Sequence, residues 1–120
     1  MRAFNLFYEK QRYVFICRHG EARSFIAAAT AKEVIAKRGL NIDVDYFGTE
    51  KKTVPEAILA LEDADSVFAM DSSIAEVVRK QYQYKRPIIT LNIKDIADKG
   101  RLEEIIHNQI GLLFEYIPLS

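Results

Sequence analysis

The sequence predicts a three-layer α/β/α domain built on an open, parallel, four-stranded sheet, and three observations support this fold class. The chain has 120 residues, which is enough for one compact domain over residues 1–120 and too few for two. Short runs of β-branched and aromatic residues alternate with longer helical patterns. The strongest of these runs is apolar at nearly every position, which is typical of a parallel strand buried on both faces. Helices are therefore expected on both faces of the sheet.

The first half of the chain is predicted to form two strands and two helices. Residues 13–17 form the first buried strand. Residues 24–38, rich in Ala, Lys and Glu, form a helix that stops at Gly39, a good C-cap residue. A shorter strand with partial alternation follows over residues 43–47. The capping-box sequence Thr-Val-Pro-Glu then opens a helix over residues 53–61, with proline inside its first turn.

The second half repeats this pattern and ends on a longer helix. Residues 66–70 form another buried strand, and a second capping box, Ser-Ile-Ala-Glu, opens a helix over residues 73–82. Residues 87–91 form a fourth strand, in which proline is tolerable at the first position. Apolar residues at helical spacing over residues 102–117 predict an amphipathic helix packed on the sheet. The leader, residues 3–8, has the composition of an extra edge strand.

Composition limits the class of protein and its setting. The charges of the 17 basic and 17 acidic residues cancel, so neither nucleic acid nor a membrane is an expected partner. The basic pairs at 51–52 and 85–86 are interpreted as solvated loop charges. A single cysteine, Cys17, excludes an intramolecular disulfide and a cysteine metal cluster. Residues 1–12 do not read as a signal peptide, and no stretch reaches the ~20 apolar residues that cross a bilayer. We expect a cytoplasmic monomer or weak dimer.

The segment with the clearest chemical signal is residues 17–24, CRHGEARS. It joins the first strand to the first helix, at the strand end where open parallel sheets place anion sites. A turn of this kind can direct backbone N–H groups at a phosphate-sized anion, and Arg23 can clamp two of its oxygens. The same positive field would favour the thiolate of Cys17, to which Ser24 could donate a hydroxyl proton. The alternative is that Cys17 is an ordinary small core residue.

Three segments carry a resemblance to a known family. Residues 14–17 followed by Arg23 and Ser24 match a strand and phosphate loop, residues 47–49 match a Gly-Thr turn, and residues 64–71 match a strand that ends in Met-Asp. In these features the chain resembles the low-molecular-weight protein tyrosine phosphatases, and in particular a group of small predicted tyrosine phosphatases on the same fold. The resemblance covers most of the chain. It implies the flavodoxin-like, phosphotyrosine phosphatase I-like form of the predicted sheet.

The resemblance also implies a mechanism that needs no metal or other cofactor. Cys17 would attack phosphorus in line and form a phosphocysteine, while Arg23 and the loop amides stabilise the phosphoryl oxygens. An aspartate after the fourth strand would protonate the leaving group and then activate water; Asp95 matches that position, with Asp98 a close second. The substrate would be a phosphorylated protein or a small aryl phosphate. The implied substrate-binding residues are Arg18, His19, Gly20, Glu21, Ala22 and Ser24.

Two alternatives remain open. Residues 18–22, RHGEA, also resemble the signature of the histidine phosphatases, in which a histidine, here His19, becomes phosphorylated. Those enzymes need a second histidine, and the other histidine of this chain is His107 in the last predicted helix. The second alternative is a non-catalytic module that binds phosphate or a phosphopeptide through a degenerate loop, with activity weak or lost. It is suggested by Gly20 and Ala22, which stand where the family commonly has asparagine and cysteine.

Overall fold

The structure is a computed structural model that describes residues 10–20 and 22–115. The predictions for residues 3–8, for Glu21 and for the end of the last helix at Ile117 lie outside the described residues. In chain order the elements are β1 (Gln11–Cys17), α2 (Arg23–Arg38), β2 (Ile42–Gly48), α3 (Val54–Glu62), β3 (Ser66–Ala69), α4 (Ser72–Lys80), β4 (Ile88–Thr90) and α5 (Lys99–Glu115). The predicted alternation of strands and helices is confirmed over these residues. None of the helices described is long and apolar enough to cross a membrane.

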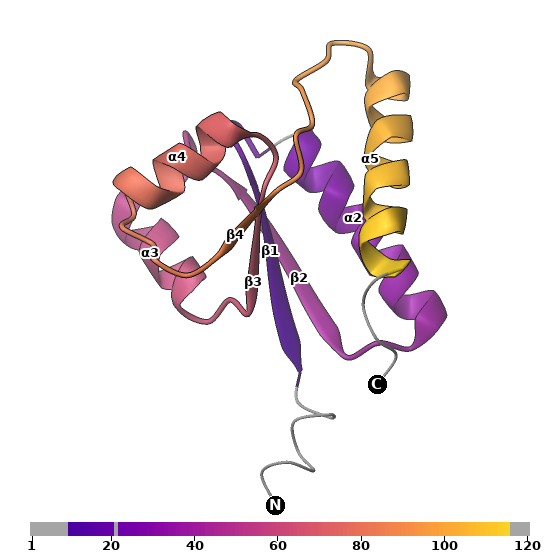
Figure 1. Cartoon of the computed structure of the whole chain (residues 1–120), viewed down its shortest axis with the longest axis horizontal. Coiled ribbons are helices and arrows are strands. Elements are labelled where there is room, and N and C mark those ends of the chain that lie inside the picture. Colours follow the sequence, from indigo (N-terminus) through magenta and orange to yellow (C-terminus); the bar gives the residue numbers. More distant parts are fainter. Residues whose placement is uncertain (1–9, 21, 116–120) are drawn as a thin grey trace, which may run out of the picture.

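The strands form one parallel sheet in the order β2-β1-β3-β4. Figure 1 shows α2 and α5 side by side on one face of this sheet, with α3 and α4 on the other. The predicted three-layer fold is therefore confirmed. Because β2 and β3 lie on opposite sides of β1, the strand order reverses between β1 and β3. Open α/β sheets bind their ligands in the crevice at the carboxyl ends of such strands.

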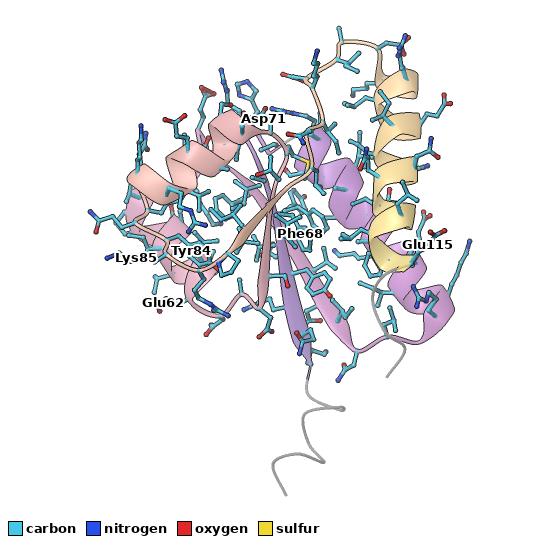
Figure 2. All side chains as sticks on the ribbon, viewed as in Figure 1. Glu62, Phe68, Asp71, Tyr84, Lys85 and Glu115 are labelled. Atoms are coloured by element: carbon cyan, nitrogen blue, oxygen red, sulfur yellow. The ribbon has the colours of Figure 1, made fainter. Side chains whose placement is uncertain are left out.

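Strand β1 separates two hydrophobic cores. Phe15 and Cys17 face the core formed with α2 and α5, and Val14 and Ile16 face the core formed with α3 and α4. Phe15 stacks on Phe68 with ring centroids 4.7 Å apart, and Figure 2 shows Phe68 at the centre of the sheet. The alternation of side chains along β1 therefore directs the Cys17 side chain toward the start of α2.

Two helix ends agree with the sequence prediction. Helix α2 is followed by Gly39 at φ +64°, whose N–H donates to the Ile35 carbonyl, so the expected left-handed C-cap is confirmed. Helix α3 begins with the predicted capping box. The N–H of Glu56 donates to the Thr53 hydroxyl at 3.3 Å, and the N–H of Thr53 donates to the Glu56 carboxylate at 3.0 Å.

The start of α4 corrects one prediction. The sequence places a capping box at Ser73, but the N-cap is Asp71, whose carboxylate accepts the N–H of Ile74 at 3.0 Å. Ser73 lies inside the helix and donates its hydroxyl to Asp71 at 2.5 Å. The carboxylate is the stronger acceptor, and an extended backbone at Asp71 brings it over the first turn. As a result an ionisable side chain lies directly after β3, at the start of α4 (Figure 2).

Candidate active site

The turn between β1 and α2, here called the β1–α2 turn (residues 18–22), starts directly after Cys17. Cys17 ends β1 with 2% of its surface exposed, and α2 begins at Arg23. Gly20 has φ +74°, a left-handed conformation that glycine adopts without strain. Ala22 precedes the helix and offers no side-chain cap, and no acidic residue occupies the first turn of α2. The N–H groups at this helix start are therefore available to an anion.

The end of β2 packs against the β1–α2 turn and is hydrogen-bonded to it. The N–H groups of Thr49 and Glu50 donate to the carbonyls of Cys17 at 2.9 Å and Arg18 at 2.8 Å, which extends the β1–β2 ladder into the turn. A Cβ on Gly48 would lie 2.2 Å from the His19 carbonyl carbon, which is closer than real Cβ atoms approach any backbone atom. Glycine is therefore required at position 48 for the turn to rest on β2.

Alanine substitutions at two glycines, one packed against backbone and one in open space, are predicted to change the free energy of unfolding in opposite directions. Gly48→Ala should lower the free energy of unfolding by about 3 kcal/mol, because the turn and the end of β2 must move apart. Gly111→Ala in α5 meets no atom within 4 Å and should raise it by about 0.5–1 kcal/mol through helix propensity. Urea denaturation followed by circular dichroism measures both. Equal stability of Gly48→Ala and the parent would contradict the close packing.

The sulfur of Cys17 accepts polar contacts although its side chain is buried. The N–H of Gly20 donates to Sγ at 3.0 Å, and the Ser24 hydroxyl lies 2.9 Å from Sγ. Sγ carries no hydrogen-bonding requirement as a core atom, yet two potential donors from the turn and from α2 are directed at it. Hydrogen-bond donors around a sulfur favour the thiolate over the thiol. The thiolate is the form of cysteine that acts as a nucleophile.

The guanidinium of Arg23 is held inside the protein, with only 4% of the residue exposed. Its Nη1 donates to the Asp71 carboxylate at 2.6 Å and to the Ile93 carbonyl at 2.9 Å. These partners follow β3 and β4, so the loops at the carboxyl edge of the sheet fix the side chain. Nη1 carries two hydrogens, and both are used. Within the described residues no acceptor takes the hydrogens on Nε and Nη2, which together form a planar fork.

Asp71 is the ion-pair partner that fixes this fork. Partial burial alone would raise its pKa, but hydrogen bonds from Arg23, Ser73 and the Ile74 N–H, together with the Arg23 charge, lower the pKa to about 2. The carboxylate therefore stays ionised at every physiological pH. One of its oxygens caps α4 while the other holds Arg23.

Removal of the Asp71 charge should have a pH-dependent effect on stability. Because folding lowers the pKa of Asp71 from 3.8 to about 2, its contribution is complete above 3.8 and is lost as the pH falls toward 2. Asp71→Asn should therefore be less stable than the parent by about 2 kcal/mol at pH 7, with the difference closing between pH 4 and pH 2. Denaturant titrations at several pH values measure it. Asp63→Asn is the control, since its side chain is 79% exposed and should cost under about 0.5 kcal/mol.

The two aspartates predicted as general acid lie in different settings between β4 and α5. Asp95 is exposed and makes no hydrogen bond or ion pair to any described residue. It lies two residues after Ile93, whose carbonyl holds Arg23. Asp98 is also exposed, and its carboxylate accepts the Arg101 N–H at 3.2 Å, so it caps the start of α5.

The remaining predicted residues are placed around the turn rather than in its centre. The side chains of Arg18 and His19 are exposed, and His19 Nδ1 lies 2.9 Å from a Glu50 carboxylate oxygen. Gly20 and Ala22 are half-buried. His107, the second histidine of the alternative mechanism, is exposed in α5, and no contact in the described chain joins it to His19.

Sequence reasoning brought together Cys17, Arg23 and Ser24 but missed the groups that hold the arginine. Asp71 and the Ile93 carbonyl were not among the predicted site residues, although Asp71 belonged to the Met-Asp segment of the resemblance. One signal was available for Asp71, because it is the first ionisable residue after a buried parallel strand. The Ile93 contact is made by a backbone carbonyl, which every residue has, so the sequence gives no indication of it.

Comparisons with known proteins agree with this fold and identify a family. The sequence model of the family described as low molecular weight phosphotyrosine protein phosphatase matches residues 12–120. No match is found among curated proteins. Among solved structures, the low molecular weight protein tyrosine phosphatase from T. tengcongensis superposes with a TM-score of 0.74 at 18% identity, covering 90% of this chain and 100% of that one.

Two further structures extend the comparison. SP-PTP, a low molecular weight protein tyrosine phosphatase from Streptococcus pyogenes, gives a TM-score of 0.72 at 13% identity over 90% of this chain and 93% of its own. The YwlE arginine phosphatase from Geobacillus stearothermophilus gives 0.69 at 18% identity over 88% of this chain and 91% of its own. At these identities the structures establish the shared fold, while the family match comes from the sequence.

Proposed function

The chain belongs to the low molecular weight phosphotyrosine protein phosphatase family and is a phosphatase of the cysteine type, and from this premise we propose the roles of its residues. Cys17 is the nucleophile, Arg23 binds and stabilises the transferred phosphoryl group, and Asp95 is the general acid. Gly20, Ser24 and the backbone of residues 18–22 complete the binding site. The phosphate of a phosphorylated tyrosine or of a small aryl ester is the group removed.

In the first step the thiolate of Cys17 attacks phosphorus as the bond from phosphorus to the leaving oxygen breaks. The bonding pair goes to the leaving oxygen, which takes a proton from Asp95. In the second step Asp95 removes a proton from water, whose oxygen attacks phosphorus. The sulfur–phosphorus bond breaks, and inorganic phosphate and the thiolate are released.

One observation carries the proposal, namely the fixed orientation of Arg23. With Nη1 held by Asp71 and Ile93, the hydrogens on Nε and Nη2 match the spacing of two phosphate oxygens. The guanidinium is preorganised, so no side-chain entropy is lost when phosphate binds. Among the residues that the structure describes, no protein acceptor takes this second pair of donors, which leaves them for a bound anion.

The activity itself is tested with para-nitrophenyl phosphate in a buffer that contains EDTA. We expect release of nitrophenolate and competitive inhibition by vanadate, which mimics the phosphoryl group in transfer. Tight binding of phosphate without any turnover would instead support the non-catalytic binding module. Cys17 is a free cysteine, and a reducing, cytoplasmic compartment is proposed because the nucleophile must remain unoxidised.

The assignment of the acid gives a prediction that separates the two aspartates. Asp95→Asn should lower kcat by about 10²-fold for esters with poor leaving groups, and by less for para-nitrophenyl phosphate, because only poor leaving groups need the proton. Asp98→Asn should leave kcat nearly unchanged, since asparagine also caps a helix. Rates for a series of aryl phosphates of rising phenol pKa measure both variants. The reverse ranking would assign the acid to Asp98.

The histidine mechanism is the less favoured function. It requires two imidazoles on one phosphoryl group, and the structure places His19 beside Glu50 and His107 on the exposed surface of α5. The buried polar groups of the site converge on sulfur and on Arg23 instead.

A further inference from the structure

Asn92, which lies between β4 and α5, has a left-handed backbone with φ +57°. Residues with a Cβ rarely adopt this conformation, and asparagine is one of the few that tolerate it. The Asn92 side chain is exposed and makes no hydrogen bond or ion pair to any described residue. No side-chain contact therefore accounts for the conformation, and backbone outliers of this kind cluster at functional sites.

The backbone hydrogen bonds on either side of Asn92 show that it is an extra residue in the sheet register. The N–H of Leu91 donates to the Ala69 carbonyl at 2.9 Å. The N–H of Ile93 donates to the Met70 carbonyl at 2.7 Å. A step of two residues after β4 is thus matched to a step of one residue after β3, whereas a regular parallel ladder matches two to two. This is the pattern of a β-bulge, which redirects the chain that follows it.

The bulge places the Ile93 carbonyl against Arg23. The Ile93 side chain is 1% exposed, in the core that also contains Cys17, and the Ile93 carbonyl accepts Nη1 of Arg23 at 2.9 Å. A regular ladder would advance Ile93 by one residue relative to β3, which carries its carbonyl about 3.3 Å along the strand direction. A hydrogen bond does not survive a shift of that size. The left-handed turn at Asn92 is therefore what allows Ile93 to hold Arg23.

The same turn sets the start of the segment that carries the proposed general acid. Asp95 lies two residues after Ile93, is exposed, and makes no hydrogen bond or ion pair to any described residue. Ile96, the next residue, is partly buried against the same core as Ile93. The place of the Asp95 carboxylate is therefore determined by the backbone between Ile93 and Ile96, and Asn92 determines where that backbone begins.

We propose, on the premise of the phosphatase function, that Asn92 is a positioning residue of the active site. Its left-handed backbone fixes the Ile93 carbonyl on Arg23 and so orients the fork that binds the phosphoryl group. It also starts the Asp95 segment in the direction that the acid needs. The Asn92 side chain takes no part, so glycine serves equally well at this position and a residue restricted to negative φ does not.

Two substitutions separate the Asn92 backbone from its side chain. Asn92→Gly keeps the left-handed conformation without the amide, whereas Asn92→Pro fixes φ near −65°. Proline removes no hydrogen bond to a described residue, because the Asn92 N–H makes none. Asn92→Gly should keep kcat for para-nitrophenyl phosphate and the Kd for vanadate within about twofold of the parent. Asn92→Pro should lower kcat and vanadate affinity by about tenfold each, because Ile93 no longer fixes the Arg23 fork. Its loss in kcat should grow for aryl phosphates with poor leaving groups, because Asp95 is displaced as well.

The matched control is Gln83→Pro. Gln83 is the other non-glycine residue with a positive φ within the part of the chain that the structure describes, at +54°, and it too is exposed. Its neighbours Tyr84 and Lys85 lie at the opposite end of α4 from Asp71 (Figure 2). Gln83→Pro should lower the urea midpoint, as Asn92→Pro does, but should keep kcat and vanadate affinity within about twofold of the parent.

Three results would overturn the role of Asn92: parental kcat and vanadate affinity in Asn92→Pro, the same losses in Asn92→Gly, or the same losses in Gln83→Pro. Circular dichroism shows whether each variant is folded. Should Asn92→Pro not fold, the β-branched Asn92→Val disfavours positive φ and takes its place, with the same result expected and the same results contradicting it. Turnover of para-nitrophenyl phosphate by the parent tests the phosphatase function separately, and the vanadate affinities test Asn92 even if turnover is absent.

Discussion

Replacement of Cys17 by serine is expected to lower turnover of para-nitrophenyl phosphate by at least about 10⁴-fold. A serine hydroxyl at this position lacks the general base that it would need to attack phosphorus, whereas the thiolate attacks without one. Vanadate should still bind the variant, because Asp71 and the Ile93 carbonyl hold Arg23 without any contribution from the sulfur. Loss of turnover with retained oxyanion binding would identify a chemical role for Cys17 rather than a packing role.

The matched control for this experiment is His19→Ala. Its side chain is exposed and pairs with Glu50, so the variant should keep turnover within about tenfold of the parent. If Cys17→Ser remained fully active and His19→Ala were dead, the mechanism would be that of a histidine phosphatase. Calorimetric titration with vanadate and steady-state rates on the same preparations distinguish these results.

Arg23→Lys is expected to give the second large loss, about 10²–10³-fold in kcat. Lysine keeps the charge but has one nitrogen, so it cannot hold Asp71 and Ile93 while donating in parallel to two phosphate oxygens. The loss should appear in kcat more than in KM, because the fork matches the transition state better than the ground state. Steady-state kinetics of the variant measure this split.

Two controls test whether the loss of kcat in Arg23→Lys comes from the missing guanidinium fork. Circular dichroism and urea denaturation should show a folded protein, since lysine can still pair with Asp71. Arg18→Lys, an exchange at the exposed arginine of the same turn, should cost much less in kcat because that side chain makes no ion pair in the described structure. A kcat for Arg23→Lys close to that of the parent would mean that the guanidinium serves only to join the loops.

The sequence predicts the local features of the fold well because each depends on neighbouring residues. The buried strand β1 follows from its apolar run, the start of α3 from its capping box, and the end of α2 from Gly39. The start of α4 was misplaced because Asp71 and Ser73 are both good caps two residues apart. Which of them caps depends on where β3 ends, and the parallel pairing with β1 fixes that end.

The site is predictable from sequence only in part, for a related reason. Cys17 and Arg23 are six residues apart on one turn, so spacing alone brings them together. Asp71 is 48 residues from Arg23, and its contact depends on the strand order that puts β3 beside β1. The contact between Gly20 and Gly48 likewise requires β2 on the other side of β1. The role of Asp95 came from resemblance alone, since an exposed aspartate before a helix has no distinguishing local pattern.

A crystal structure of the protein soaked with vanadate or tungstate tests the central claim most directly. The oxyanion should lie over the sulfur of Cys17, with two oxygens bound by Nε and Nη2 of Arg23 and the Asp71 contact to Nη1 kept. An oxyanion bound at His19 instead, or an empty turn at saturating concentrations, would contradict the claim that Cys17 and Arg23 form a phosphate site.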